Sequence, residues 1–147
     1  MRVYLDNCCF NRPFDNQKQI QIKLETEAKL YIQEKIKKQE IELIWSYILD
    51  YENRKNPYID RKNLIQTWKY RAVADIDETE EIIINAERIK KIGIKTKDAL
   101  HVACAVFAKC NYFITTDKRI ISLSSFENLK IVNPIEFIRN MEEDNEN

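Results

Sequence analysis

Residues 113–121 read "FITTDKRII", and this stretch decides the fold. An apolar run over 112–114 stops at two threonines and then at Asp117. The N-terminus repeats this arrangement, because the apolar run 2–5 is followed at once by Asp6. Short apolar runs without polar alternation are typical of parallel strands covered on both faces. We therefore predict two buried parallel strands that each lead into an aspartate.

Helical and strand patterns alternate along the rest of the chain. Apolar residues recur every three to five positions in several segments, as on one face of an amphipathic helix. Strands are predicted over 2–5, 41–45, 112–116 and 129–132, a polar loop over 6–17, and helices over 17–38, 47–55, 59–73, up to Ile92, from 96 to a close at Asn111, and from Pro134. Strands that alternate with helices predict an α/β sandwich around a mainly parallel sheet.

Several helix ends carry residues that suit them. Ser46 is expected to cap the helix that starts at residue 47, and either Asp77 or Thr79 can cap the helix that ends at residue 92. Thr96 can cap the next helix. Gly93 is the only glycine in the chain, and it stands where a left-handed residue commonly ends a helix.

Composition indicates one ordinary globular domain. The chain has 147 residues, of which 44% are hydrophobic and 33% charged, and it contains no Gly- or Ser-rich linker. We expect a single domain over residues 1–140 and an acidic, frayed tail over 141–147. No apolar stretch approaches the ~20 residues that span a bilayer. The N-terminal residues lack the zones of a secretory signal, so we expect a cytoplasmic protein without a membrane partner.

Neither the net charge nor the cysteines indicate a particular function, and one basic segment allows two interpretations. Lys plus Arg and Asp plus Glu both number 24, so the net charge is zero and does not favour nucleic acid by itself. The segment 54–71 is locally basic, with aromatic residues among its cations, and reads either as a solvated helix face or as a phosphate-contacting patch. The four cysteines lack the paired spacing of a zinc site, so we expect reduced, unliganded thiols.

Four acidic residues are expected to converge. The carboxyl ends of parallel strands meet at one edge of a sheet, so Asp6 and Asp117 should emerge together there. Asp98 lies in the first turn of its predicted helix, where the helix dipole also stabilises an acid for purely structural reasons. Glu52 lies beside the apolar face of its helix, rather than opposite that face.

Such a cluster calls for a hard cation. Four carboxylates without a counter-charge repel one another, and several would hold protons. Mg²⁺ or Mn²⁺ suits an all-carboxylate site, whereas zinc or copper prefers histidine or thiolate. The chemistry that fits is metal-dependent hydrolysis of a phosphodiester.

Three segments together resemble the PIN-domain ribonucleases, a family that includes the VapC-like toxins of toxin–antitoxin pairs. They read "VYLDNCCFNRP" at 3–13, "SYILDYENRKNP" at 46–57 and "KTKDALHVACAVFAKCNYFITTDKRII" at 95–121. The resemblance implies a three-layer α/β/α sandwich with a central, mainly parallel sheet and an acidic quartet that binds Mg²⁺ or Mn²⁺. By motif, the quartet corresponds to Asp6, Glu52, Asp98 and Asp117, the same four residues that the topology selects.

The resemblance also concerns the surroundings of the quartet. Thr115 or Thr116 matches a hydroxyl residue that often assists the metal site in this family. Many members have Ser, Thr or Asn two residues after the first aspartate, where this chain has Cys8, and Asn7 can partly substitute as a polar neighbour. The implied partners are an RNA substrate, an antitoxin protein and a second copy of the chain in a homodimer.

The sequence therefore predicts a metal-dependent endoribonuclease that cleaves single-stranded RNA, and the resemblance implies that it could serve as the toxin of a toxin–antitoxin pair. The alternative is a non-catalytic PIN-like module that binds RNA or a protein. A nucleotidase for small substrates is more distant, because no Gly-rich phosphate loop exists. His101 is read as a neutral packing residue, or else as a hydrogen-bonding neighbour of the site. Trp68 and Tyr70 are read as packing or oligomer contacts, or else as stacking platforms for bases.

Overall fold

A six-stranded sheet forms the centre of the protein in the computed structural model, which describes residues 1–146. The strand order is β3-β2-β1-β4-β6-β5. All neighbours are parallel except the pair β5 and β6, which is antiparallel. The strands are β1 (Arg2–Leu5), β2 (Glu42–Ser46), β3 (Ala74–Ile76), β4 (Tyr112–Ile114), β5 (Ser125–Phe126) and β6 (Leu129–Val132).

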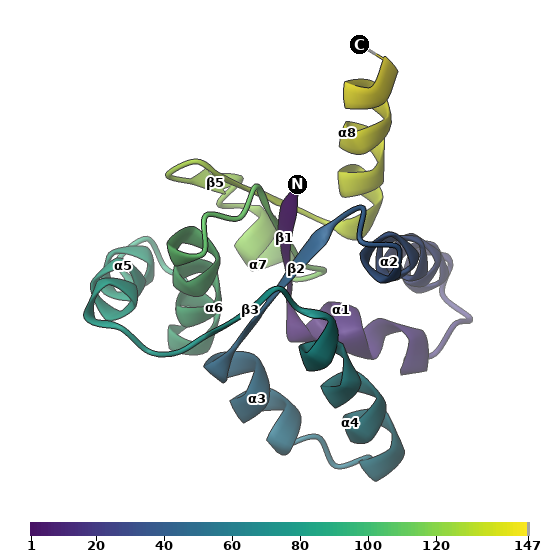
Figure 1. The fold of residues 1–147 in the computed structure, drawn as a ribbon, viewed down its shortest axis with the longest axis horizontal. Helices are drawn as coiled ribbons and strands as arrows, with labels where there is room; N and C mark the ends of the chain where they lie inside the picture. Colours follow the sequence, from purple (N-terminus) through teal and green to yellow (C-terminus); the bar gives the residue numbers. More distant parts are fainter. Residues whose placement is uncertain (147) are drawn as a thin grey trace.

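Helices cover both faces of the sheet (Figure 1). On one side lie α5 and α6, which pack against each other, and on the other side lie α1, α2 and α4. The helical elements are α1 (Asn7–Asn11), η1 (Arg12–Phe14), α2 (Ile20–Lys37), α3 (Tyr47–Arg54), α4 (Ile59–Gln66), η2 (Thr67–Arg71), α5 (Glu80–Lys90), α6 (Thr96–Phe107), α7 (Lys118–Ile121) and α8 (Pro134–Glu146). The predicted three-layer α/β/α sandwich is confirmed.

The core lies between these layers and is rich in aromatic rings. Tyr4 stacks on Phe113 with their centroids 5.3 Å apart, and Phe10 meets Trp45 edge-on at 5.5 Å. All four side chains are fully buried. Such pairs stabilise a core beyond the burial of their area. They also fix β1 relative to β4 and α1 relative to β2, which are the elements that carry the site described below.

Most predicted helix ends are confirmed. The Ser46 hydroxyl accepts from the Leu49 N–H at 3.3 Å and caps α3. Thr79, rather than Asp77, caps α5. Gly93 has a φ of +109°, the left-handed conformation expected after that helix.

The predicted boundaries differ from the structure at other places. The segment 6–17 was expected to be a loop, but α1 and η1 fill most of it because the Asp6 carboxylate caps α1. Thr96 is the first residue of α6 instead of its cap, and α6 ends at Phe107, before Asn111. The predicted helix 59–73 is divided into α4 and the 3₁₀ segment η2. Strands β3 and β5 were not predicted.

The C-terminal segment also differs from expectation. Residues 141–146, expected to be frayed, continue α8 as far as Glu146. Residue 147, the last of the predicted tail, lies outside the described part of the chain. Over residues 1–146, no helix combines the length and apolarity needed to cross a membrane.

The amino edge of the sheet is closed by polar contacts. The Arg2 backbone N–H donates to the Asn111 side-chain oxygen at 2.8 Å, and the Asn111 N–H donates to the Arg2 carbonyl at 2.8 Å. The Arg2 guanidinium donates to the Ala108 carbonyl at 2.7 Å and pairs with Glu42 at 3.2 Å. This edge therefore ties β1, β2 and the approach to β4 together.

Candidate active site

The site is at the carboxyl edge of the sheet, where β1 ends at Asp6. β1 lies between β2 and β4, so its neighbours are reached by connections on opposite sides, the arrangement that opens a crevice in α/β sheets. Asp6 is 5% exposed. Its carboxylate accepts from the Asn7 N–H at 2.8 Å and from the Thr115 hydroxyl at 2.8 Å. Asp6 is thus held in place by its own helix start and by the residue that follows β4.

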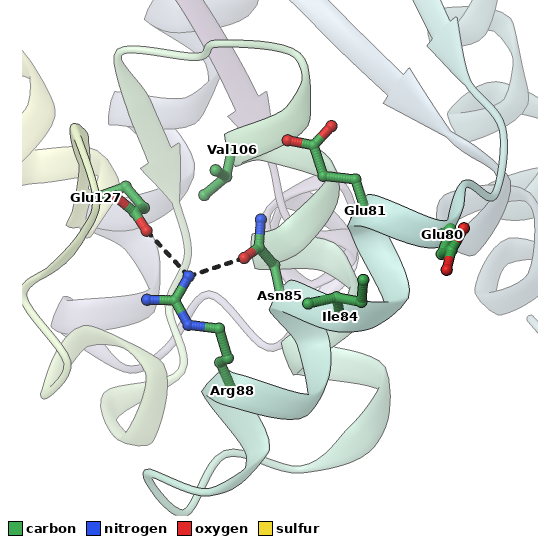
Figure 2. Close-up of a pocket in the computed structure, with 7 residues that line it drawn as sticks. All are labelled: Glu80, Glu81, Ile84, Asn85, Arg88, Val106 and Glu127. Carbon is green, nitrogen blue, oxygen red and sulfur yellow. Dashed lines mark hydrogen bonds and ion pairs between the residues drawn. The ribbon is translucent and has the colours of Figure 1, made fainter.

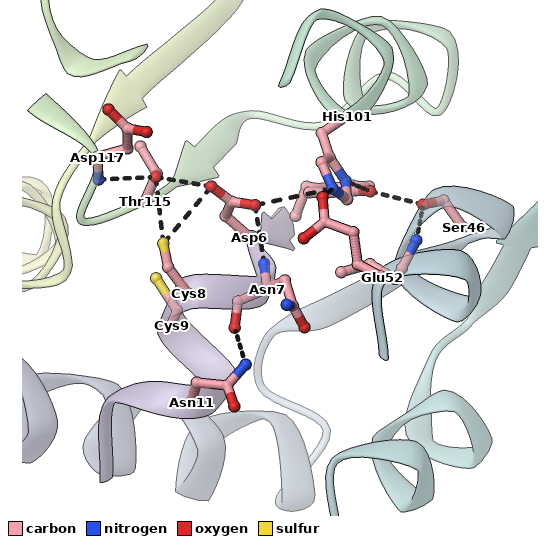
Figure 3. A network of polar contacts seen from close by, with 12 residues as sticks. Asp6, Asn7, Cys8, Cys9, Asn11, Ser46, Glu52, His101, Thr115 and Asp117 are labelled. Carbon is pink, nitrogen blue, oxygen red and sulfur yellow. Dashed lines mark hydrogen bonds and ion pairs between the residues drawn. The ribbon is translucent and has the colours of Figure 1, made fainter. Parts of the chain in front are cut away.

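Asp117 is connected to Asp6 through Thr115 (Figure 3). The Thr115 hydroxyl donates to Asp6 and accepts from the Asp117 N–H at 3.1 Å. The Asp117 carboxylate also accepts from the Arg119 N–H at 2.9 Å and caps α7. Thr116 contributes its backbone N–H, which donates to the Cys8 sulfur at 3.4 Å. Of the two threonines, Thr115 is therefore the one whose hydroxyl joins the acidic residues.

Glu52 reaches the same place from α3 through His101 of α6. The Glu52 carboxylate is 2.5 Å from the His101 Nε2 atom, and the nearer Asp6 oxygen is 3.9 Å from that same atom. His101 is fully buried and its Nδ1 atom is 2.5 Å from the Tyr4 hydroxyl. Of the two interpretations of His101, the structure therefore supports the hydrogen-bonding neighbour of the site, because His101 joins two of the predicted acidic residues.

A chain of polar groups continues from His101 into the core. The Tyr4 hydroxyl is 2.6 Å from the Ser46 hydroxyl, which also caps α3. When His101 is neutral with a proton on Nε2, Tyr4 donates to Nδ1; when His101 is charged, Nδ1 donates to Tyr4, which then donates to Ser46. The chain Ser46–Tyr4–His101–Glu52 therefore serves both charge states of the histidine.

Burial and hydrogen bonding oppose each other in this chain. Burial lowers the pKa of His101, but the Glu52 hydrogen bond and the nearby Asp6 charge outweigh it, and the net pKa is raised. Burial raises the pKa of Glu52, yet the His101 bond and charge bring the net pKa below its ordinary value. For Asp6, burial dominates and the pKa is raised. The Glu52–His101 contact is accordingly best described as a carboxylate–imidazolium pair.

Asp98 completes the cluster from the first turn of α6. It is half-buried, and its pKa is raised to about 6, first by burial and then by the charges of Asp6 and Asp117. No ion pair relieves it within residues 1–146, where the quartet's only ion-pair partner is His101. Asp98 thus lies near enough to Asp6, Asp117 and Glu52 for their charges to raise its pKa, although the four acids come from four separate parts of the chain.

The donor set fits a divalent cation in its chemistry. Carboxylate and amide oxygens are the ligands that Mg²⁺ and Mn²⁺ prefer. Besides the four acids, the buried Asn7 side-chain oxygen has no hydrogen-bond partner, so an amide acceptor is free beside Asp6. As they stand in the described chain, no three His, Cys, Asp or Glu side chains already enclose a metal position. Binding a cation would therefore require the carboxylates to turn toward one another.

Cys8 lies inside the cluster. Its sulfur is 3.5 Å from the Asp6 carboxylate and 3.5 Å from the Thr115 hydroxyl. The thiol therefore makes, more weakly, the contacts with which a hydroxyl at this position would orient Asp6. All four cysteines have free thiols.

Sequence reasoning missed Tyr4 and Ser46 as parts of the site. Their signal is their place in the strands: Tyr4 lies two residues before Asp6, and Ser46 is the last residue of β2. Both residues therefore lie near the carboxyl edge of the sheet, as the aspartates do. The sequence alone does not give the register of the strands, however, so it cannot show which strand side chains face the site.

A larger surface cavity lies elsewhere. It has a volume of about 650 Å³ and is lined from α5, α6 and the turn before β6 (Figure 2). Arg88 spans it, donating to Asn85 at 3.0 Å and to Glu127 at 3.1 Å. None of the four predicted acids lines this cavity, so cavity size alone would have identified the wrong region.

Comparisons with known proteins give a likeness in structure. No protein-family model matches the sequence, and no curated protein matches it. Among solved structures, VapBC2 from Rickettsia felis, bound to a DNA fragment from its promoter, contains a similar chain with a TM-score of 0.56 and 14% identity. The match covers 90% of this chain and 98% of the other.

A second solved structure, VapBC-1 from nontypeable Haemophilus influenzae, gives a TM-score of 0.57 at 15% identity. It covers 92% of this chain and 99% of that chain. Nearly whole chains align in both cases, so the likeness concerns the complete domain instead of one motif. At these identities it is a likeness of fold, and it confirms the resemblance on which the sequence analysis relied: the chain has the PIN-like fold of the VapC chains.

Proposed function

We propose that this protein is a Mg²⁺- or Mn²⁺-dependent endoribonuclease that hydrolyses phosphodiester bonds of single-stranded RNA. The observation that carries the proposal is the convergence of Asp6, Asp98 and Asp117 at the carboxyl edge of the sheet, without Lys or Arg paired to them in the described chain. A permanent structural role would call for counter-charges, whereas a metal-binding role calls for their absence.

Each residue would have a distinct part in the reaction. Asp6, Asp98 and Asp117 would hold the cation, which when bound stabilises charge on the phosphoryl oxygens and makes water more acidic. Glu52 would orient the attacking water and accept its proton. The water oxygen forms a bond to phosphorus while the bond to the leaving ribose oxygen breaks, and that oxygen takes up a proton from solvent. His101 keeps Glu52 ionised, because a carboxylate paired with an imidazolium has a lowered pKa.

The test compares the wild type with Asp6→Asn on a labelled single-stranded RNA in Mn²⁺. Loss of a mere neighbour of a metal ligand commonly costs ~10–100-fold, so loss of a ligand should reduce cleavage by about a hundredfold or more. The asparagine oxygen can still accept from the Asn7 N–H, and its NH2 group can donate to the Thr115 hydroxyl in place of the bond that Asp6 accepts there, so circular dichroism and the unfolding midpoint should be preserved. Undiminished manganese-dependent cleavage by Asp6→Asn would refute the proposal.

The partner proposal follows from the solved neighbours, which are VapBC assemblies. We infer that this chain acts as a VapC-like toxin and is held inactive by an antitoxin protein. Expression of the wild type should arrest growth of a host cell, and Asp6→Asn should not. The expected homodimer is checked separately by light scattering of the purified chain.

A non-catalytic PIN-like module is the alternative, and one observation favours it. Glu52 is already engaged by His101, and no three ligating side chains enclose a metal position in the described residues. Calorimetry decides between the two. Heat of Mn²⁺ binding that Asp6→Asn abolishes supports the nuclease, whereas no binding up to millimolar Mn²⁺ supports the module.

A further inference from the structure

A second, smaller cavity opens directly beside the acidic cluster. Its volume is about 240 Å³. This is below the ~300–1,000 Å³ typical of sites for drug-sized ligands, so it suits a single nucleotide unit. It is lined by Glu52 and Asn7 of the candidate site and by Lys55, Tyr58 and Arg61 of the basic segment. The cavity therefore connects the proposed cleavage site with the basic, aromatic segment 54–71, for which the sequence allowed either a solvated face or a phosphate-contacting patch.

The cations at this cavity have no acidic partners. Within residues 1–146, neither Lys55 nor Arg61 forms an ion pair with a carboxylate. The Lys55 ammonium instead donates to the Tyr51 hydroxyl at 2.6 Å and lies 4.3 Å from that ring. Lys55 is exposed, so it can turn from Tyr51 to a phosphate at little cost. The positive charge is therefore available for an anion.

Tyr58 is held as a platform. Its backbone N–H donates to the Asn56 side-chain oxygen at 3.1 Å. The Arg61 guanidinium lies 4.4 Å from the Tyr58 ring and 5.0 Å from the Phe14 ring, and it donates to the Phe14 carbonyl at 3.1 Å. Despite these contacts Tyr58 remains 60% exposed. An exposed ring fixed in this way costs little entropy when a flat group stacks on it.

The other aromatic candidates of the basic segment do not share this position. Trp68 packs against the core, and Lys37 and Arg71 lie 5.6 Å and 5.9 Å from its ring. Tyr70 is 85% exposed, but it does not line the cavity. Of the alternatives open for Trp68, packing is therefore the one that the structure supports, and base stacking moves to Tyr58.

We propose that this cavity binds one nucleotide of single-stranded RNA next to the scissile phosphate, with the base on Tyr58 and a flanking phosphate on Lys55. The proposal rests on the proposed ribonuclease function. Stacking on aromatic rings combined with cations along the backbone is how proteins hold unpaired strands. Arg61 is a positioning residue, since it orients the Tyr58 ring.

The test measures binding separately from cleavage. All variants are made in the Asp6→Asn background, and fluorescence anisotropy follows a labelled oligoribonucleotide of about ten nucleotides, within the site sizes typical of single-strand binders. Tyr58→Ala should weaken binding about tenfold, and Tyr58→Phe should restore it, because the ring and not the hydroxyl stacks. Lys55→Gln should reduce the slope of log affinity against log salt by about 0.7.

Two matched controls come from the same basic segment. Tyr70→Ala removes an exposed aromatic ring outside the cavity, and Lys62→Ala removes a cation of α4 that does not line it. Both should bind RNA within about twofold of the parent, the usual range for surface changes. If Tyr58→Ala and Lys55→Gln also bind within that range, or if the controls lose as much, the cavity is not an RNA site. In that case a protein segment becomes its better occupant.

The two proposals fail differently. Wild-type cleavage with unaffected binding by Tyr58→Ala overturns the nucleotide site and leaves the ribonuclease intact. Selective loss of binding in Tyr58→Ala, with no cleavage by the wild type, supports the nucleotide site and overturns the ribonuclease. No RNA binding by the parent protein overturns the nucleotide site directly.

Discussion

At its amino edge the sheet is closed by hydrogen bonds and by an ion pair of Arg2, whereas at its carboxyl edge it gathers four carboxylates, of which two pair with His101. The first edge satisfies its polar groups. The second raises the pKa of Asp6 and of Asp98, first through burial and then through neighbouring carboxylates, so keeping these groups ionised lowers the stability of the folded chain. The comparison shows that the fold loses stability at the carboxyl edge, which is the edge that carries the candidate site.

The largest effect on this comparison should come from His101→Ala, which removes the residue that forms the ion pairs with Asp6 and Glu52. It removes the ion-pair partner of Glu52 and one of the two hydrogen bonds of the buried Tyr4 hydroxyl, so the free energy of unfolding should fall by about 3 kcal/mol at pH 6. The raised pKa of His101 stabilises the folded state fully below the unfolded value near 6.5. That part of the loss should shrink as pH rises through the folded pKa.

Urea unfolding of wild type and His101→Ala from pH 5 to pH 9 checks this. Tyr4→Phe is the control, because it removes only the hydroxyl and should cost about 1 kcal/mol. If the difference in the free energy of unfolding between wild type and His101→Ala stays constant over the whole pH range, the histidine is not charged in the folded protein.

Asp98→Asn should have the opposite effect and raise the free energy of unfolding at pH 7. Because the pKa of Asp98 rises from 3.8 to about 6 on folding, the metal-free folded state loses stability as pH increases across that interval. At pH 7 the variant should therefore be more stable than wild type by about 1–2 kcal/mol, a value reduced for the partial exposure of the group. Below pH 4 the two should coincide.

Thermal unfolding at pH 4 and pH 7 measures this effect. Asp60→Asn is the matched control, since Asp60 also lies in the first turn of a helix but outside the cluster. It should lose a few tenths of a kcal/mol at pH 7 through the helix dipole. If Asp98→Asn also destabilises at pH 7, the carboxyl edge does not carry repulsive charge.

Arg2→Ala tests the amino edge. It removes the bond to the Ala108 carbonyl and the exposed pair with Glu42, so the free energy of unfolding should fall by about 1–2 kcal/mol. Glu42→Gln removes only the exposed pair and should lower the free energy of unfolding by less than about 1 kcal/mol. RNA cleavage should be unchanged in both variants, and a loss of cleavage would show that the two edges are coupled.

The smallest effect is expected at Lys109, just after α6 on the amino edge. Its φ is 57°, a left-handed conformation that is unfavourable for a residue with a Cβ atom. Lys109→Gly should raise the unfolding free energy by about 0.5–1 kcal/mol, and Gly93→Ala should lower it by a similar amount. Equal midpoints for Lys109→Gly and wild type in chemical denaturation would contradict this.

The sequence allowed the centre of this fold to be predicted, but not its periphery. β1 and β4 are compact apolar runs, and the acids that follow them needed only the rule that parallel strands end at one edge. β3 consists of Ala74, Asp75 and Ile76, in which no residue is fully buried, so it has no apolar run to detect. Its pairing with β2 is a tertiary effect.

The four acids of the site were predicted, but the hydrogen bonds that connect them to other residues were not. Asp6 was read as a ligand, so its second role as the cap of α1 was overlooked and the segment after it was taken for a loop. His101 lies three residues after Asp98, on the same side of α6, and that spacing was visible. What no spacing shows is that Glu52 of another helix comes within 2.5 Å of it.

The order of the strands has a consequence for how this domain can vary. Asp6 follows β1, Asp117 comes after β4, and Ser46, which caps the Glu52 helix, ends β2. These three strands are consecutive parallel neighbours in the interior of the sheet. Both outermost strands, β3 and β5, contribute none of the four acids. Additions, deletions or partner strands at either margin can therefore be accommodated while the spacing between the acids is kept, because the scaffold that sets this spacing is enclosed by strands that can change.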